Sequence, residues 1–187
     1  MTHSIDFEGI EEKLFLIQQI VLGSRAYCED KHIGRSLHPY GEGAWADYSS
    51  RLQSLISSYT IDCAIKTRMA QDFIMANGSD VNLSDVDEES REGYNIGTVH
   101  KGNITLTLRE SCNKIIHATR VDLSWVETRL RRSKKKIEHW NGGYNLHGKH
   151  GALAWHVELD MLSWAVAMET FHTFLNERVD WYRVYGL

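Results

Sequence analysis

The sequence predicts a mainly α-helical protein, in which four helices form a bundle and a small antiparallel β-sheet is inserted between the third and fourth. Apolar residues recur at steps of three and four over most of the chain, which is the period of a helix. From about residue 119 to residue 159 this period gives way to alternation, with frequent glycine and aromatic residues, which is typical of short strands. The 187 residues suit one domain, 1–187, with this β insertion at about 119–159.

The first two helices are expected at about residues 6–28 and 44–76, because the segment between them contains the only proline, Pro39, with two glycines beside it. The second helix is expected to end near Asn77 and Gly78, a common C-cap pair. The apolar positions that carry the helical period are Ile10, Leu14, Ile17, Val21 and Leu22 in the first helix, and Leu52, Leu55, Ile56, Tyr59, Cys63, Ile65, Met69 and Phe73 in the second.

Residues 79–102 are polar and acidic, which predicts a long loop. Its acidic run, Asp85 to Glu92, is most simply a solvated surface; the alternative is that it covers a basic patch of the chain as a mimic of nucleic acid. The remaining elements expected are a helix at about 104–118, strands near 121–125, 143–148 and 153–159, and a last helix at about 161–183 with Asp160 as its N-cap.

The composition limits the classes of function that the chain can have. Because the net charge is −4, any affinity for nucleic acid must come from a local patch. The three cysteines, Cys28, Cys63 and Cys112, are odd in number and widely spaced, which indicates a reducing compartment. The N-terminal segment lacks the basic residues of a signal peptide, and no apolar run is long enough to span a bilayer. We therefore expect a cytoplasmic protein with no membrane contact, no metal and no cofactor.

The third expected helix carries three polar residues at spacings of four: Arg109, Asn113 and His117. Residues four apart on a helix nearly stack, so these side chains form one ridge beside an apolar face. A histidine can move a proton at neutral pH, and an arginine can hold a phosphate through its fixed fork of donors. Such a ridge could promote attack of an RNA 2′-hydroxyl on its own phosphate. The competing interpretation is an ordinary polar helix surface.

The stretch NKIIHA, which contains Asn113 and His117, resembles the signature of HEPN-domain proteins. That signature is an arginine, usually followed by a polar residue, with four to six residues between the arginine and a histidine. Cys112 stands where the arginine most often stands, and Arg109 lies one residue beyond the usual range. The strand, glycine-aromatic hairpin and terminal helix that follow extend the resemblance over roughly residues 104–175.

The resemblance implies a four-helix HEPN-like bundle that forms a homodimer, with the two motif helices facing each other across the two-fold axis. It implies a metal-independent endoribonuclease of toxin or phage-defence type, whose partner would be an antitoxin or another defence protein. In that case His117 is the acid or base and Arg109 holds the scissile phosphate. Asn113 orients either His117 or Arg109. The alternative is a catalytically inactive HEPN-like module that binds RNA or a partner protein.

The run RLRRSKKK, residues 129–136, contains six basic side chains in eight. Cations of this kind bind backbone phosphates, whereas the competing interpretation is a solvated turn between strands. Trp140 and Tyr144 are the nearest candidates for base stacking. The predicted RNA-binding residues are Arg120, Arg129, Arg131, Arg132, Lys134, Lys135 and Lys136.

Four histidines, His139, His147, His150 and His156, crowd into eighteen residues. A metal site is conceivable, but no carboxylate or cysteine completes a recognisable ligand spacing, so these side chains are expected to face solvent. Cys112 is not expected to be a nucleophile, because its spacing places it on the apolar side of the helix.

Overall fold

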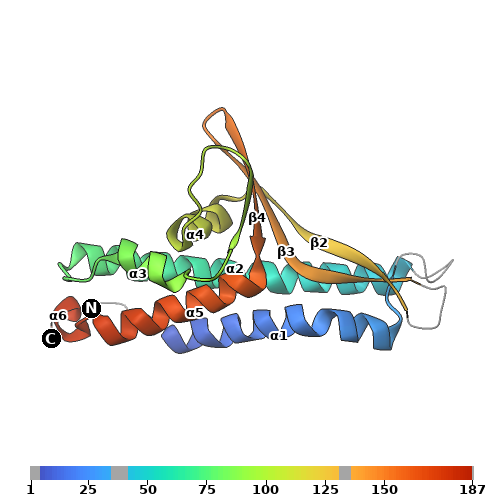
Figure 1. Ribbon diagram of the computed structural model, residues 1–187, viewed down its shortest axis with the longest axis horizontal. Coiled ribbons are helices and arrows are strands. Elements are labelled where there is room, and N and C mark those ends of the chain that lie inside the picture. The colour runs from blue at the N-terminus through green and yellow to red at the C-terminus, as the bar shows by residue number, and fades with distance from the viewer. Residues whose placement is uncertain (1–4, 35–41, 131–135, 187) are drawn as a thin grey trace.

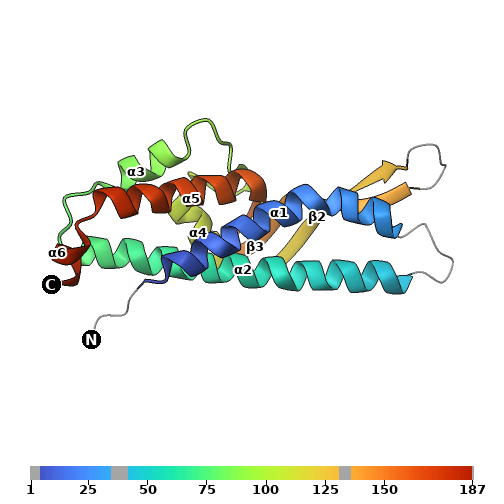
Figure 2. The same cartoon turned by 90° about the horizontal axis from the view of Figure 1, so that it is seen from below.

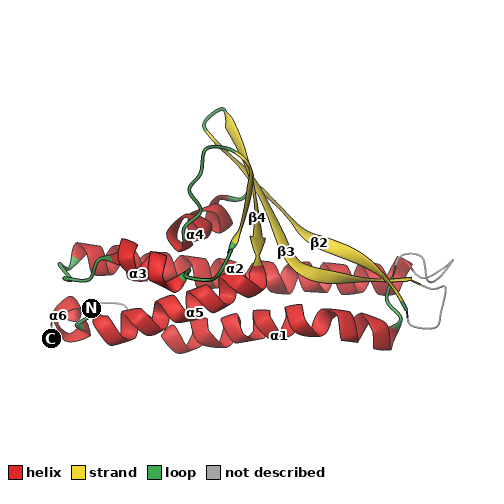
Figure 3. Ribbon diagram, viewed as in Figure 1, coloured by secondary structure: helices red, strands yellow, loops and turns green. Residues whose placement is uncertain are grey.

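The computed structural model describes residues 5–34, 42–130 and 136–186. The described chain is mostly helical, with one small antiparallel sheet (Figure 3). Its elements are α1 (Phe7–Lys31), α2 (Glu42–Ala76), α3 (Leu83–Ser90), β1 (Gly97–Lys101), α4 (Leu108–His117), β2 (Arg120–Arg129), β3 (Lys136–His150), β4 (Leu153–Asp160), α5 (Met161–Arg178) and α6 (Trp181–Tyr185).

Three long helices, α1, α2 and α5, lie side by side and form one layer of the molecule (Figures 1 and 2). α1 and α2 run in opposite directions, and α5 runs back along α1 toward the end where the chain begins. The first and last described segments meet there, since the Ile5 N–H donates to the Tyr185 hydroxyl at 3.3 Å. The sheet and α4 form the second layer, on one side of these helices (Figure 1).

The sheet has the strand order β1-β4-β3-β2, with every neighbouring pair antiparallel. The prediction that it lies wholly between the third and fourth expected helices is wrong, because β1 precedes α4 in the chain. At Gly148 of β3 the indole of Trp155 lies against the backbone, so an added Cβ would overlap the ring. Only glycine fits there.

The prediction of one long loop over residues 79–102 is also wrong, since this segment holds α3 and β1. α3 begins because the Asn82 side chain accepts a hydrogen bond from the Ser84 N–H at 3.0 Å. Val86 of α3 and Ile96 before β1 are both buried in the core. With eight residues, half of them acidic, α3 shows too little apolar periodicity to be recognised from sequence.

The prediction of a final helix capped by Asp160 is confirmed, as its carboxylate accepts from the Ser163 N–H at 2.9 Å. The last expected helix, 161–183, is in fact divided: α5 ends at Arg178, and α6 follows after a new cap at Asp180. No helix in the described part of the chain combines the length and apolar character needed to cross a membrane.

The core has two parts. The larger cluster joins the three long helices, α4 and the inner face of the sheet, and its largest buried side chains include Trp140, Trp164 and Phe171. The second cluster is small and lies where α1 ends and β3 begins; its buried members are Cys28, Ile33, Trp45 and Ile137. There the Glu138 N–H donates to the Ile33 carbonyl at 3.2 Å.

Candidate functional site

α4 presents the apolar face that its sequence predicts. Leu108, Cys112 and Ile115 are buried in the main core. Inside it, the indole N–H of Trp164 donates to Ser111 Oγ at 2.8 Å, which ties α4 to α5. The predicted place of Cys112 on the apolar side of the helix is confirmed, and burial raises the pKa of its thiol to about 12.

The N-terminus of α4 is held by a buried carboxylate. Asp87 of α3 is 4% exposed and accepts from the backbone N–H groups of Leu108, at 3.1 Å, and Arg109, at 3.0 Å. Its second function is to pair with Arg91, whose Nε lies 2.6 Å from the same carboxylate. A negative group at a helix N-terminus satisfies free N–H groups and opposes the helix dipole. Asp87 therefore holds the first turn of α4 together with the N-cap residue Thr107, whose hydroxyl accepts from the Glu110 N–H at 3.0 Å.

Arg109 does not project freely from this end of the helix. Its guanidinium donates to Asp72 Oδ1 at 2.8 Å and to Gln71 Oε1 at 3.2 Å, both on α2. It stands at the edge of a cleft of about 580 Å³ that α2, α3 and the residues before α4 enclose, with Met75, Asp87 and other residues in its lining. The guanidinium thus has a carboxylate partner before any phosphate arrives.

The other two ridge residues differ in their surroundings. Asn113 donates to Glu110 Oε2 at 3.0 Å, within its own helix. His117 is exposed and is the last residue of α4. Arg109 and His117 are eight residues apart, which separates them by about 12 Å along the helix axis. They share a ridge, as predicted, but one chain does not bring both to the same phosphate group.

The predicted RNA-binding residues are described only in part, because Arg131, Arg132, Lys134 and Lys135 lie outside the described residues. Arg120, at the start of β2, donates from Nε to Asp122 at 2.8 Å. Arg129 and Lys136 face each other across β2 and β3, and the Lys136 ammonium pairs with Glu127. Two of these three described cations therefore have acidic neighbours.

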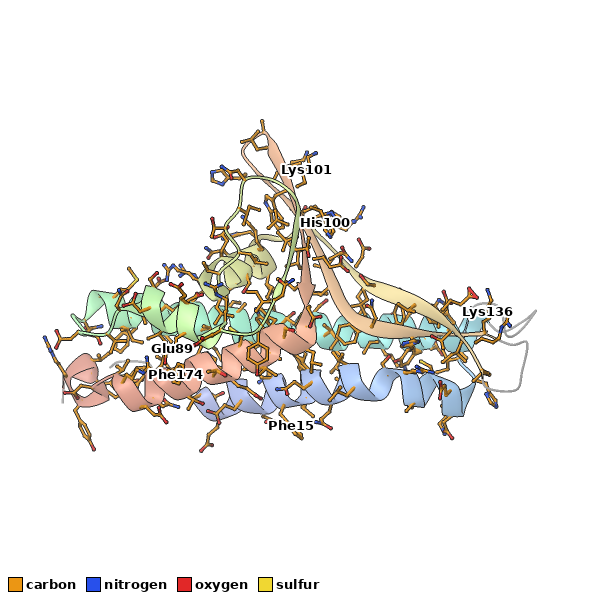
Figure 4. The ribbon with its side chains drawn as sticks, in the orientation of Figure 1. Phe15, Glu89, His100, Lys101, Lys136 and Phe174 are labelled. Atoms are coloured by element: carbon orange, nitrogen blue, oxygen red, sulfur yellow. The ribbon has the colours of Figure 1, made fainter. Side chains whose placement is uncertain are left out.

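The acidic run does not cover Arg129 or Lys136, the described cations at the two ends of the basic run. Glu89 of α3 and Lys136 lie toward opposite ends of the long helices (Figure 4). Glu89 instead pairs with Arg178 of α5 through contacts of 2.6 and 2.8 Å. Two of the acidic residues of α3 thus attach it to its neighbours: Asp87 to α4 and Glu89 to α5.

The two aromatic candidates for base stacking are buried, which corrects that prediction. Trp140 is inaccessible and donates its indole N–H to the Gly143 carbonyl at 2.8 Å. Tyr144 packs in the core and its hydroxyl donates to Ser57 Oγ at 3.1 Å. Both point to the inner face of the sheet, where RNA has no access.

The histidines divide into separate groups. His150 is exposed at the end of β3, and His139 is half-buried with its Nδ1 lacking a partner in the described structure. His147 and His156 stack on the outer face of the sheet, with ring centroids 4.1 Å apart. His100 of β1 stacks on His156 at 4.6 Å, and sequence reasoning missed it because its strand was expected to be loop. The described residues contain no group of three or more side chains that could hold a metal ion.

Comparison with known proteins adds no family to this description: no family model, no curated protein and no solved structure matches the chain.

Proposed function

We propose that the protein is a HEPN-like endoribonuclease, of toxin or phage-defence type, that cleaves RNA without a metal by attack of the 2′-hydroxyl. The observation that carries this proposal is the position of His117, exposed at the end of α4 and three residues before an exposed arginine, Arg120. A histidine that solvent reaches can exchange protons with a substrate, and a nearby guanidinium can hold the phosphate.

The arginine of this site is better assigned to Arg120 than to Arg109. The Arg120 side chain is 67% exposed, and its ion pair with Asp122 lies at the surface. Such pairs are worth about 0–1 kcal/mol, so a phosphate can compete for the guanidinium. Arg109 is held by two acceptors from α2 and lies about 12 Å from His117 along the helix.

A homodimer is part of the proposal. α2, which packs against α4, carries Ile61, Ile65 and Met69 at spacings of four, and all three are exposed. Apolar side chains in such a row favour burial against a second surface. In this homodimer, the resemblance to HEPN proteins implies that the two α4 helices face each other across the two-fold axis. An antitoxin or another defence protein is the further partner that this function implies.

The second candidate function is a catalytically inactive HEPN-like module that binds RNA or a partner protein. The contacts of Arg109 favour it, because Asp72 and Gln71 of α2 together hold the arginine nearest to the family signature.

The test is incubation of the protein with single-stranded RNA in EDTA, with the products separated on a gel. Wild type should cleave; His117→Ala and Arg120→Ala should each lose at least about 100-fold of the rate. Arg178→Ala, which removes an arginine paired on α5, is the matched control and should cleave normally. Full activity of His117→Ala would exclude this site, and intact RNA with wild type would favour the binding module. Sedimentation of Ile65→Glu tests the dimer.

A further inference from the structure

Three histidine rings form a stack across the outer face of the sheet, one on each of three neighbouring strands. His100 of β1 stacks on His156 of β4, and His156 stacks on His147 of β3. The ring centroids are 4.6 and 4.1 Å apart, and the ring planes are inclined by 29° and 19°. Arg120 of β2 continues the line, since its guanidinium lies 3.2 Å from His147 Nε2. We call His100, His156 and His147 the histidine row.

One end of the histidine row is open. β1 lies at the edge of the sheet, where it pairs with β4, and the His100 side chain is 41% exposed. His156 covers one side of the His100 ring, and no other aromatic ring in the described part of the chain stacks on it. Figure 4 shows His100 on the part of the sheet that projects away from the three long helices. A flat ring from a ligand can therefore extend the stack at His100.

Hydrogen bonds hold the rings in place before any ligand binds. His100 Nε2 lies 3.1 Å from a carboxylate oxygen of Glu158, and His156 Nε2 lies 2.8 Å from Asn145 Oδ1. Burial lowers the pKa of His156, and the neighbouring His147 and His100 lower it further, which favours an uncharged ring in the middle of the stack. Because the rings are already ordered, a ligand that joins the stack causes little further loss of side-chain entropy.

Two lysines lie beside the histidine row, on the side nearer the turn between β3 and β4. Lys149 lies two residues beyond His147 in β3, so both side chains point to the same face of the sheet. Lys101 lies opposite His156, where the register between β1 and β4 shifts. Such a bulge sets two residues, here His100 and Lys101, against one residue of the partner strand. Both lysines are exposed, and neither forms an ion pair with a described residue.

The acidic residues of this face lie on the other side of the row. Glu158 accepts a hydrogen bond from Ser124 at 2.7 Å, and Asp122 accepts from Arg120 Nε at 2.8 Å, so both carboxylates have partners. Residues 146–157, which form the projecting β3–β4 hairpin, include no acidic residue. The side of the row nearer the turn is therefore positive, which is where a phosphodiester backbone would be attracted.

We propose that the histidine row and the lysines beside it bind single-stranded RNA: one base stacks on His100, and the backbone runs past Lys101 and Lys149 to Arg120. This inference rests on the proposed function, in which His117 keeps the proton transfer and Arg120 the scissile phosphate. Three strand spacings of about 4.8 Å place His100 about 14 Å from Arg120. A short run of nucleotides, rather than a single nucleotide, spans that distance.

Binding of this kind selects RNA by its structure. In a duplex the bases are stacked on one another inside the helix, whereas an unpaired base can be splayed out onto a flat side chain. Every base has a π-face, so stacking tolerates any base sequence. The substrate class is therefore unpaired RNA, with little preference for base sequence at the nucleotide that contacts His100.

The first test measures binding alone, in the full chain, by fluorescence anisotropy of a single-stranded RNA whose 2′-hydroxyls are methylated and cannot attack. His100→Ala should weaken binding about 5- to 150-fold, which corresponds to the about 1–3 kcal/mol that stacking of one base contributes. His100→Phe keeps a flat ring without the hydrogen bond to Glu158, and it should bind within about twofold of wild type. His150→Ala removes an exposed histidine of the same sheet that is outside the row, and serves as the matched control.

Two further measurements separate the roles of the side chains. Lys101→Ala and Lys149→Ala should each reduce the slope of log affinity against log salt concentration by about 0.7, because each removes one phosphate contact to a single strand. In cleavage of unmodified RNA in EDTA, His100→Ala should raise KM and leave kcat unchanged, since the stack holds substrate and transition state alike. His117→Ala should instead lower kcat.

The outcomes distinguish this inference from the function it rests on. If wild type cleaves RNA but His100→Ala matches its affinity and KM, the RNA-binding row is wrong and the endoribonuclease stands. Equal losses in His100→Phe and His100→Ala, or duplex RNA bound as tightly as single-stranded RNA, would also overturn the row. If wild type binds RNA through His100 and leaves it intact, the row is supported and the enzyme is wrong. If wild type neither binds nor cleaves RNA, both proposals are overturned.

Discussion

Replacement of Asp87 by asparagine tests whether a buried carboxylate holds α4 in place. The carboxylate accepts two backbone hydrogen bonds from the first turn of α4 and one from Arg91. Asparagine keeps one acceptor oxygen, but its amide would face an N–H donor where the second carboxylate oxygen now lies. Hydrogen bonds to charged groups contribute about 1.5–3 kcal/mol each, and the asparagine loses at least one of them together with the charge. We expect Asp87→Asn to lower the free energy of unfolding by about 3 kcal/mol.

Urea denaturation followed by circular dichroism measures this change, and a drop in Tm of about 6–12 °C should accompany it in a domain of this size. Asp85→Asn is the matched control, because Asp85 is exposed on the same helix and its loss should cost less than about 0.5 kcal/mol. An Asp87→Asn protein within about 0.5 kcal/mol of wild type would show that the carboxylate does not anchor α4, and the reasoning would be refuted.

Two further predictions concern the core and the backbone. Burial lowers the pKa of His172 to about 4, and its ring bonds Thr67. As the pH falls, His172 gains a proton in the unfolded chain before it does so in the folded one. The free energy of unfolding should therefore decrease as the pH falls from about 6.5 toward 4, by up to about 3 kcal/mol. Urea denaturation at pH 7.5 and 5 should show a smaller difference for His172→Gln, and an unchanged difference would contradict the assignment. Gly148→Ala should destabilise by at least about 1–3 kcal/mol through overlap with Trp155, whereas Gly23→Ala, with open space in the middle of α1, should stabilise by about 0.5–1 kcal/mol. Thermal denaturation should show a lower Tm for Gly148→Ala and a higher Tm for Gly23→Ala. Equal changes in Tm would argue against the close packing of Trp155 on Gly148.

The long helices could be predicted from the sequence because the apolar periodicity or the capping residue that indicates each one lies within the helix itself or next to it. The helices expected at 6–28 and 44–76 correspond to α1 and α2 with shifts of a few residues, and Asp160 marks the start of α5 as expected. α3 and β1 were missed because their stability comes from elsewhere. An eight-residue helix buries little of itself, and β1 depends on hydrogen bonds to β4, which is more than fifty residues away in the chain.

In the candidate site, too, the features that follow from local spacing could be predicted, whereas those that depend on contacts between distant elements could not. Helical spacing predicted correctly that Arg109 and His117 share a ridge. It could not predict that Asp72, from α2, neutralises Arg109, since that contact depends on how two helices pack. Nor could spacing place His100 beside His156: the two rings meet only through the pairing of β1 with β4, and β1 itself was expected to be loop.

We expect the end of the molecule that contains the small cluster of Cys28, Ile33, Trp45 and Ile137 to open locally before the rest of the domain unfolds. Its few apolar side chains contribute much less to stability than the main cluster does, and only part of the long helices passes through it. Backbone amides around Ile33 and Ile137 should therefore exchange with deuterium through local opening, while those of α5 exchange only when the whole domain unfolds. Arg129 at the end of β2 and Lys136 at the start of β3 lie beside this cluster, so local opening there would displace these two cations while the structure around α4 stays folded.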